Sequence, residues 1–237
     1  MGTLISERQD NFMSTCDLFA NVPLRPSTDS STQSLCEKYR PRRIAEFTGQ
    51  DRAKTILQKF AAQPYRKAWI FAGPTGTGKS SMALALASEV AAELHHLVPT
   101  STREDIEHVW AECQGFPAPG YKRHLILVDD VDGLSKAALT TLLAKLDARD
   151  DAPDIIWVFT CPGTEKLDRR FLSFCGEIKF PSYGIAKEAT ALLKRVWEAE
   201  SSQADAIPPN FARIVKESNN DIRAALMTLE TMIITND

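Results

Sequence analysis

The sequence predicts an α/β fold with a five-stranded parallel sheet, followed by a small helical part. Two observations support this prediction. From Tyr39 onward, short apolar runs alternate with segments of helical periodicity, which is typical of parallel strands joined by helices. After Pro181 only helical patterns remain. We therefore expect an α/β domain over residues 36–181 and a helical domain over residues 182–237.

The apolar runs place the strands, and the spacing of apolar residues places the helices. We expect strands over residues 68–72, 94–98, 124–129, 155–160 and 176–180. One helical stripe follows Ser135, a plausible N-cap, and comprises Leu139, Leu142, Leu143 and Leu146. Two further stripes follow the last strand, with Asn220 or Asp221 as the cap of the second: Ile185, Ala189, Leu192, Leu193 and Val196, and then Ile222, Leu226, Leu229 and Ile233.

The composition excludes several classes of protein. The chain has 237 residues, of which 43% are hydrophobic and 25% charged, as in ordinary globular proteins. No apolar run approaches the roughly 18 residues of a membrane helix. Five cysteines without a CxxC pair argue for a reducing compartment, and against a disulfide framework or structural zinc. We therefore expect a cytoplasmic protein, or a nuclear one in a eukaryote, without a membrane partner.

Charge and the N-terminal segment add two expectations. The net charge of −3 gives no overall attraction to nucleic acid, so any DNA contact must come from a local patch. A basic cluster could form such a patch, and it comprises Lys38, Arg40, Arg42 and Arg43. A solvated protein face would explain the same cluster equally well. Residues 1–35 are expected to be a flexible tail, because the polar stretch 27–34 cannot bury a core.

A glycine-rich segment, GPTGTGKS, joins the first predicted strand to a helix. It runs from Gly73 to Ser80 and fits the pattern GxxxxGK[ST] in the strand-to-helix context that this pattern requires. We call it the phosphate loop, because its glycines let backbone N–H groups surround phosphate oxygens. Lys79 supplies a charge for the β- and γ-phosphates, and Ser80 a hydroxyl for Mg²⁺. The predicted ATP-binding residues are Gly73, Pro74, Thr75, Gly76, Thr77, Gly78, Lys79, Ser80 and Ser81.

Two carboxylates end the third predicted strand. Asp129 and Asp130 follow four apolar residues, fifty residues after Lys79. Asp129 is predicted to complete the Mg²⁺ site with Ser80, and Asp130 to act as the general base that orients the attacking water. The alternative is a buried strand that ends in a solvated turn, which the phosphate loop makes the weaker interpretation.

Four segments resemble clamp-loader AAA+ ATPases, the family of replication factor C small subunits and of bacterial gamma and delta-prime subunits. Residues 39–50, YRPRRIAEFTGQ, are similar to the opening of that family, and residues 129–135, DDVDGLS, to its Walker B stretch. Residues 101–106 are similar to the segment after its second strand. Residues 221–229, DIRAALMTL, match its sensor-2 pattern. The resemblance covers roughly residues 36–235.

The resemblance implies a P-loop AAA+ core with strand order 5-1-4-3-2 and a helical lid. Tyr39, Arg40 and Pro41 would lie beside the adenine, and Arg223 would reach the γ-phosphate from the lid. The implied function is that of an ATP- and Mg²⁺-dependent clamp-loader-like ATPase in DNA replication or repair, in which ATP sets the lid angle and subunit assembly. The implied partners are other AAA+ subunits in a hetero- or homo-oligomer, DNA, and a sliding clamp.

The sequence departs from the family pattern in its catalytic residues. Asp130 stands where the family has Glu, and a shorter side chain predicts slow hydrolysis. Phe174 stands at the arginine of the family's S-R-C motif, and only Arg169 and Arg170 nearby could substitute. Thr160 stands where the family has its polar sensor-1 residue, Asn or Thr, and we expect Thr160 to fill that role. These departures leave an alternative function, that of a structural subunit that binds nucleotide but hydrolyses little of it.

The remaining features suggest further alternatives. We find no counterpart of the family's helical collar domain in the 237 residues. A second alternative is therefore another kind of DNA-handling AAA+ protein, such as a helicase loader or a transposition regulator. In the tail, residues 16–19, CDLF, faintly resemble a clamp-binding peptide, although Thr15 stands where Gln is expected. The four histidines show no metal-ligand spacing, so we expect structural or surface roles for them: His95, His96, His108 and His124.

Overall fold

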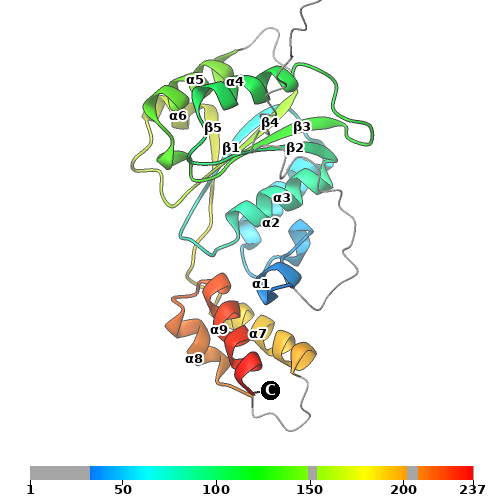
Figure 1. The fold of residues 1–237 in the computed structure, drawn as a ribbon, viewed down its shortest axis with the longest axis vertical. Coiled ribbons are helices and arrows are strands. Elements are labelled where there is room, and N and C mark those ends of the chain that lie inside the picture. Colours follow the sequence, from blue (N-terminus) through cyan, green and yellow to red (C-terminus); the bar gives the residue numbers. More distant parts are fainter. Residues whose placement is uncertain (1–32, 149–153, 202–207, 237) are drawn as a thin grey trace, which may run out of the picture. The chain divides into compact units, whose positions relative to one another are not determined.

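A computed structural model describes residues 33–148, 154–201 and 208–236 (Figure 1). The clamp-peptide-like residues 16–19 lie outside this range. Five parallel strands form one sheet in the order β2-β3-β4-β1-β5. They are β1 (Lys67–Ala72), β2 (Ala92–Leu97), β3 (Arg123–Val128), β4 (Ile155–Cys161) and β5 (Cys175–Lys179). The predicted strands and their order are confirmed, with ends shifted by one or two residues.

The register brings the carboxyl ends of three strands together. Phe71 of β1 pairs with Thr160 of β4, and Val128 of β3 pairs with Phe159 of β4. Because the strands are parallel, the segments that follow β1 and β3 leave the sheet at the same edge. The phosphate loop and Asp129 therefore meet there.

Helices cover both faces of the sheet. One core cluster packs α2 (Asp51–Ala62) and α3 (Lys79–Glu89) against one face. The other packs α4 (Arg103–Glu112), α5 (Lys136–Asp147) and α6 (Arg169–Phe174) against the opposite face (Figure 1). Strand residues serve the two clusters alternately, as the pleat requires: Leu125 and Leu127 belong to the first, and Ile126 and Val128 to the second. Ser135 caps α5, as predicted, by accepting from the backbone N–H of Ala138.

The helical patterns after Pro181 are confirmed as helices. They are α7 (Ala186–Glu200), α8 (Phe211–Glu217) and α9 (Ile222–Asn236), which share a third core cluster. The short α1 (Leu35–Lys38) packs in this cluster through Leu35, although its sequence position is beside the α/β part. Asp221 is the cap of α9, since its Oδ1 accepts from Ala224 N at 3.0 Å. The division of the chain at residue 181 stays a prediction.

Two 3₁₀ helices complete the described secondary structure: η2 (Ile44–Glu46) and η3 (Val131–Gly133). None of the helices in the described ranges is long and apolar enough to cross a membrane.

Replacing Phe159 with alanine is expected to cost about 3–5 kcal/mol of unfolding free energy, the usual loss for a buried aromatic ring. Phe159 is fully buried in β4, with its ring centroid 4.8 Å from that of Phe171. Denaturant unfolding measures the change, and Tyr183→Ala, at an exposed position, is the control with a change within about 0.5 kcal/mol. Similar midpoints for the two variants would contradict this account of the core.

Candidate nucleotide-binding site

The phosphate loop runs from the end of β1 to the start of α3, and its glycines are required by the backbone. Gly76 and Gly78 have φ angles of 70° and 91°, which residues with a Cβ rarely adopt. A Cβ added to Gly73 would lie 2.1 Å from the carbonyl oxygen of Phe180, just after β5. The loop can therefore take this path only with glycine at these positions, as the sequence pattern predicted.

Lys79 lies inside the loop and directs its charge toward the loop backbone. Its side chain is buried, and Nζ donates hydrogen bonds to the carbonyl oxygens of Gly73 and Pro74 at 2.7 and 2.8 Å. Burial lowers the pKa of Lys79, and the nearby carboxylates of Asp129 and Asp130 oppose that shift. A buried cation held only by carbonyl oxygens suits an anionic ligand, because a phosphate would offer it a full negative charge.

Asp129 lies at the centre of a hydrogen-bonded group beside the loop. We call this group, which also contains Ser80, Thr160 and His96, the Asp129 set. Oδ1 of Asp129 accepts from the hydroxyls of Ser80 at 2.7 Å and Thr160 at 2.9 Å, and Oδ2 lies 2.9 Å from Nε2 of His96. Burial raises the pKa of Asp129, but the hydrogen bonds from His96, Ser80 and Thr160 outweigh it, so the pKa lies below its usual value. An ionised carboxylate beside a serine hydroxyl is an oxygen donor set of the kind Mg²⁺ prefers.

Asp130 follows Asp129 in a left-handed conformation, with φ 45° and ψ 56°. Aspartate tolerates this region better than most residues, and such conformations gather at functional sites. The Asp130 side chain is exposed, and its backbone N–H donates to Oγ1 of Thr160 at 2.9 Å. Thr160 is buried and bonds both carboxylate residues, so in this structure it positions Asp129 and Asp130.

The start of α9 contacts the phosphate loop through Asp221. A Cβ added to Gly76 would lie 1.8 Å from Oδ1 of Asp221, so the carboxylate lies directly against this glycine. Arg223 is exposed on the same helix, and its charge contributes, after burial, to the lowered pKa of Lys79. The structure thus brings Arg223 into the electrostatic field of the loop, although its contact with a γ-phosphate stays a prediction.

The predicted adenine-side residues have partners elsewhere. The Tyr39 hydroxyl bonds to Glu200 of α7, and burial followed by this bond raises the pKa of Tyr39 to about 12. Arg40 pairs with Glu37 of α1 at 3.1 Å, and Pro41 is half-buried. Tyr39 therefore faces α7 and Arg40 faces α1 in this structure, and the predicted role of all three residues remains a prediction.

Two further residues of the same segment, Phe47 and Gln50, were not among the predicted ATP-binding residues. The Phe47 ring lies 3.2 Å from the position of a Cβ added to Gly78. Gln50 is buried, its Nε2 donates to the Pro181 carbonyl at 3.0 Å, and its Oε1 has no hydrogen-bond partner among the described residues. An unpaired buried acceptor fits a ligand that carries a donor group, such as the amino group of adenine.

His96 is a further residue that the sequence reasoning assigned to a structural or surface role. It lies in β2 opposite Leu127 of β3, and contacts Asp129 just beyond the end of that strand. The expected strand order puts the second predicted strand beside the third, and the second strand carries His95 and His96. These two facts together could have predicted that a histidine lies near Asp129.

The positions considered for a trans-acting arginine lie in α6, with Arg169 and Arg170 at its start and Phe174 at its end. Phe174 is half-buried there, at the family's arginine position. Arg169 is exposed, and Arg170 pairs with Asp147 of α5 at 3.4 Å. The structure describes these side chains within one subunit, so the loss of the arginine role stays a prediction.

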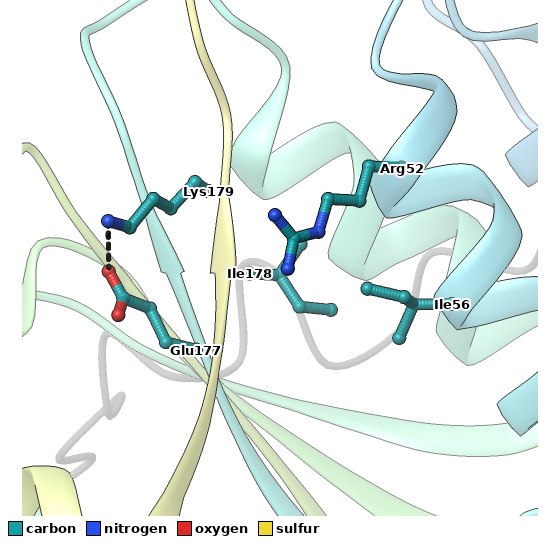
Figure 2. Close-up of a pocket in the computed structure, with 5 residues that line it drawn as sticks. All are labelled: Arg52, Ile56, Glu177, Ile178 and Lys179. Carbon is teal, nitrogen blue, oxygen red and sulfur yellow. Dashed lines mark ion pairs between the residues drawn. The ribbon is translucent and has the colours of Figure 1, made fainter.

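A cavity of about 180 Å³ lies between α2 and β5. Figure 2 shows Arg52 and Ile56 of α2 on the same side of β5 as Ile178, while Lys179 and Glu177, an ion pair at 4.0 Å, lie on the other side of the strand. None of its five lining residues belongs to the phosphate loop or to the Asp129 set. This cavity is therefore separate from the residues that the sequence predicts to bind ATP and Mg²⁺ at the loop and at Asp129.

Comparison with known proteins finds a family model and several curated relatives that match this chain. Residues 69–182 match the model of the AAA family, the ATPase family associated with various cellular activities. The replication factor C large subunit of Nanoarchaeum equitans is 32% identical over 211 residues, which cover 83% of this chain and 46% of that protein. Replication factor C subunit 2 of Saccharomyces cerevisiae is 24% identical over 223 residues, which cover 84% and 60%. The chain thus spans about half the length of the curated relatives it matches.

The solved structures agree on the fold. The RuvB Holliday junction branch migration motor of Thermotoga maritima has a TM-score of 0.67 at 20% identity, over 81% of this chain and 64% of that chain. This likeness shows the AAA+ arrangement of sheet and helices. Together with the phosphate loop and the acidic strand end beside it, these comparisons identify residues 69–182 as an AAA-family domain, in a chain whose sequence is similar to subunits of replication factor C.

Proposed function

We propose that this chain binds ATP and Mg²⁺ at the phosphate loop and works as a clamp-loader-like ATPase in DNA replication or repair. The observation that carries the proposal is the Asp129 set, in which one ionised carboxylate holds Ser80 next to the buried Lys79. Ser80 and Asp129 would hold the metal ion, which when bound offsets the negative charge of the phosphate oxygens. Lys79 and the loop N–H groups would bind the phosphates themselves.

The remaining roles follow from where the side chains lie. Asp130 is exposed at the end of β3, where it can accept a proton from an attacking water. Thr160 acts as a positioning residue, since its hydroxyl bonds Asp129 and accepts from Asp130 N–H. Arg223 on α9 would meet the γ-phosphate, so that the nucleotide state sets the angle of the helical lid.

The partners are proposed from the relatives. Homology to replication factor C subunits supports assembly with other AAA+ subunits and action on DNA with a sliding clamp. A second candidate is a subunit that binds nucleotide with little hydrolysis, favoured by Phe174 at the family's arginine position and by the shorter Asp130. Steady-state ATP turnover, measured with primed DNA, a sliding clamp and partner subunits, separates the two: the ATPase turns over in the full mixture, and the structural subunit does not.

Replacing Lys79 with alanine is expected to weaken ATP–Mg²⁺ binding by about 10–100-fold. The variant loses charge-assisted hydrogen bonds worth about 1.5–3 kcal/mol, and about 1.4 kcal/mol corresponds to a factor of ten in the dissociation constant. The rise in melting temperature with ATP–Mg²⁺ measures the effect by linkage. Lys179→Ala, which removes an exposed lysine from β5, is the matched control. An unchanged ATP-induced shift in the Lys79 variant would remove this lysine from the site.

A further inference from the structure

Three metal-binding side chains meet on the sheet face that α4 covers. His95 lies on the edge strand β2, His124 on β3, and Cys113 is the C-cap of α4. One ligand atom from each lies within 4.8 Å of the other two. Cys113 and His124 are buried and His95 is half-buried. Strand pairing and helix packing assemble this group, which is why spacing along the sequence did not predict it.

The contacts around the two rings favour one nitrogen of each neutral imidazole as the one that carries the lone pair. Nε2 of His124 lies 3.2 Å from the carbonyl oxygen of Gly115, which can only accept, so Nε2 carries the proton and Nδ1 the lone pair. Nδ1 of His95 lies 3.4 Å from a carboxylate oxygen of Glu112, a contact that favours the proton on this nitrogen and the lone pair on Nε2.

These two lone pairs face each other. Nε2 of His95 and Nδ1 of His124 are 3.0 Å apart. Two acceptors at that distance repel unless a proton or a metal ion lies between them. Two nitrogens bound to one tetrahedral zinc ion, each at about 2.0–2.1 Å, are about 3.3 Å apart. A shift of a few tenths of an ångström would therefore make both rings ligands of one ion.

We propose that His95, Cys113 and His124 bind a zinc ion. Two imidazole nitrogens and one thiolate are a donor set that zinc favours, whereas Mg²⁺ prefers oxygen ligands, so this site is distinct from the Asp129 set. The Glu93 carboxylate, 3.5 Å from Nδ1 of His124, or a water would take the fourth position. The ion binds Sγ of Cys113 as the thiolate, and the displaced proton goes to the solvent.

The neighbours of the three ligands support a structural site. Glu112 and the Gly115 carbonyl hold the outer nitrogens of the rings, which is how outer-shell groups orient histidines that bind metal. Glu93 also accepts from the backbone N–H of Ala118 at 2.8 Å. An ion here would join β2, β3, the end of α4 and the loop that follows it. It would thereby fasten an edge strand that has a single neighbour in the sheet.

Metal titration of the full chain tests the proposal. The chain is freed of metal with a chelator, then titrated with Zn²⁺ or Co²⁺, and bound metal is counted by mass spectrometry. We expect one Zn²⁺ per chain, a higher melting temperature with Zn²⁺, and a thiolate-to-metal absorption band with Co²⁺. Cys113→Ala should abolish the band and His95→Gln the one-to-one binding. Glu112→Gln should weaken zinc binding by about 10–100-fold, the usual effect of losing an outer-shell partner.

Two variants are matched controls. Cys175→Ala removes a half-buried cysteine from β5, at the other edge of the sheet, and His108→Ala removes an exposed histidine that also faces Glu112. Both should bind zinc as the parent does. If Cys113→Ala fails to fold, His95→Gln at the half-buried position carries the test. The proposal is wrong if the parent binds no zinc, if Co²⁺ gives no thiolate band, or if binding survives both ligand variants. In those cases a shared proton lies between the rings.

Discussion

ATP turnover by this chain is expected to rise by about 10³–10⁵-fold when a partner subunit supplies an arginine to its nucleotide site, the usual effect of an arginine finger. The chain keeps the residues that act within its own site, namely Lys79, Ser80 and Asp129. At the family's arginine position it carries Phe174, whose ring offers no charge to a phosphoryl group. Alone, the protein should bind ATP and hydrolyse it slowly, even at concentrations that favour self-association.

Steady-state ATPase rates measured against protein concentration test this expectation. Phe174→Arg should partly restore turnover by the protein alone, provided that its subunits stack in the family's geometry. Phe116→Arg, which places the same charge on a fully exposed loop residue, is the control. Rapid, concentration-dependent turnover in the parent that persists after Arg169→Ala and Arg170→Ala together would contradict the missing-finger argument.

Replacing Asp130 with asparagine is expected to lower the remaining turnover by about 10²–10⁴-fold, the usual contribution of a general base, while ATP binding stays equal or becomes tighter. Asparagine has the shape of aspartate and tolerates the left-handed backbone at this position, so the variant removes the charge alone. Asp130→Glu should leave turnover equal or raise it, because the carboxylate then reaches as far as the family's glutamate.

The matched control for Asp130 is Asp51→Asn at an exposed position of α2. Turnover and ATP-induced thermal shifts are measured on the same preparations, so that a loss of binding is not mistaken for a loss of chemistry. Parent-like turnover in both Asp130 variants would place the base elsewhere or show that the chain is not a hydrolase.

The parts of the site that lie within one continuous segment could be predicted from the sequence. The phosphate loop needs glycines at set intervals between a strand and a helix, and Asp129 follows an apolar run, so both leave a local pattern. The strand order came from the family resemblance and agrees with the observed pairing. Local patterns also placed the N-caps of α5 and α9, since a cap depends on residues three positions apart.

The parts that depend on contacts between distant segments could not be predicted in the same way. His96 reaches Asp129 because β2 pairs with β3, and His95 meets His124 and Cys113 through the same pairing and the packing of α4. Tyr39 was expected beside the adenine, but a bond to Glu200 of α7 takes up its hydroxyl here. The sequence shows which chemical groups such residues carry, whereas the partners of these groups are set by tertiary packing.

The Asp221 carboxylate lies directly against Gly76, within the loop that we propose binds phosphate. Phosphate oxygens and this carboxylate carry the same sign of charge, so we expect a nucleotide bound in the loop to repel Asp221 and move it aside. Asp221 begins α9, and its displacement therefore moves the first turn of that helix. Thermodynamic reciprocity then requires that a protein which binds and holds α9 changes the affinity for ATP by the same factor as ATP changes the affinity for that protein.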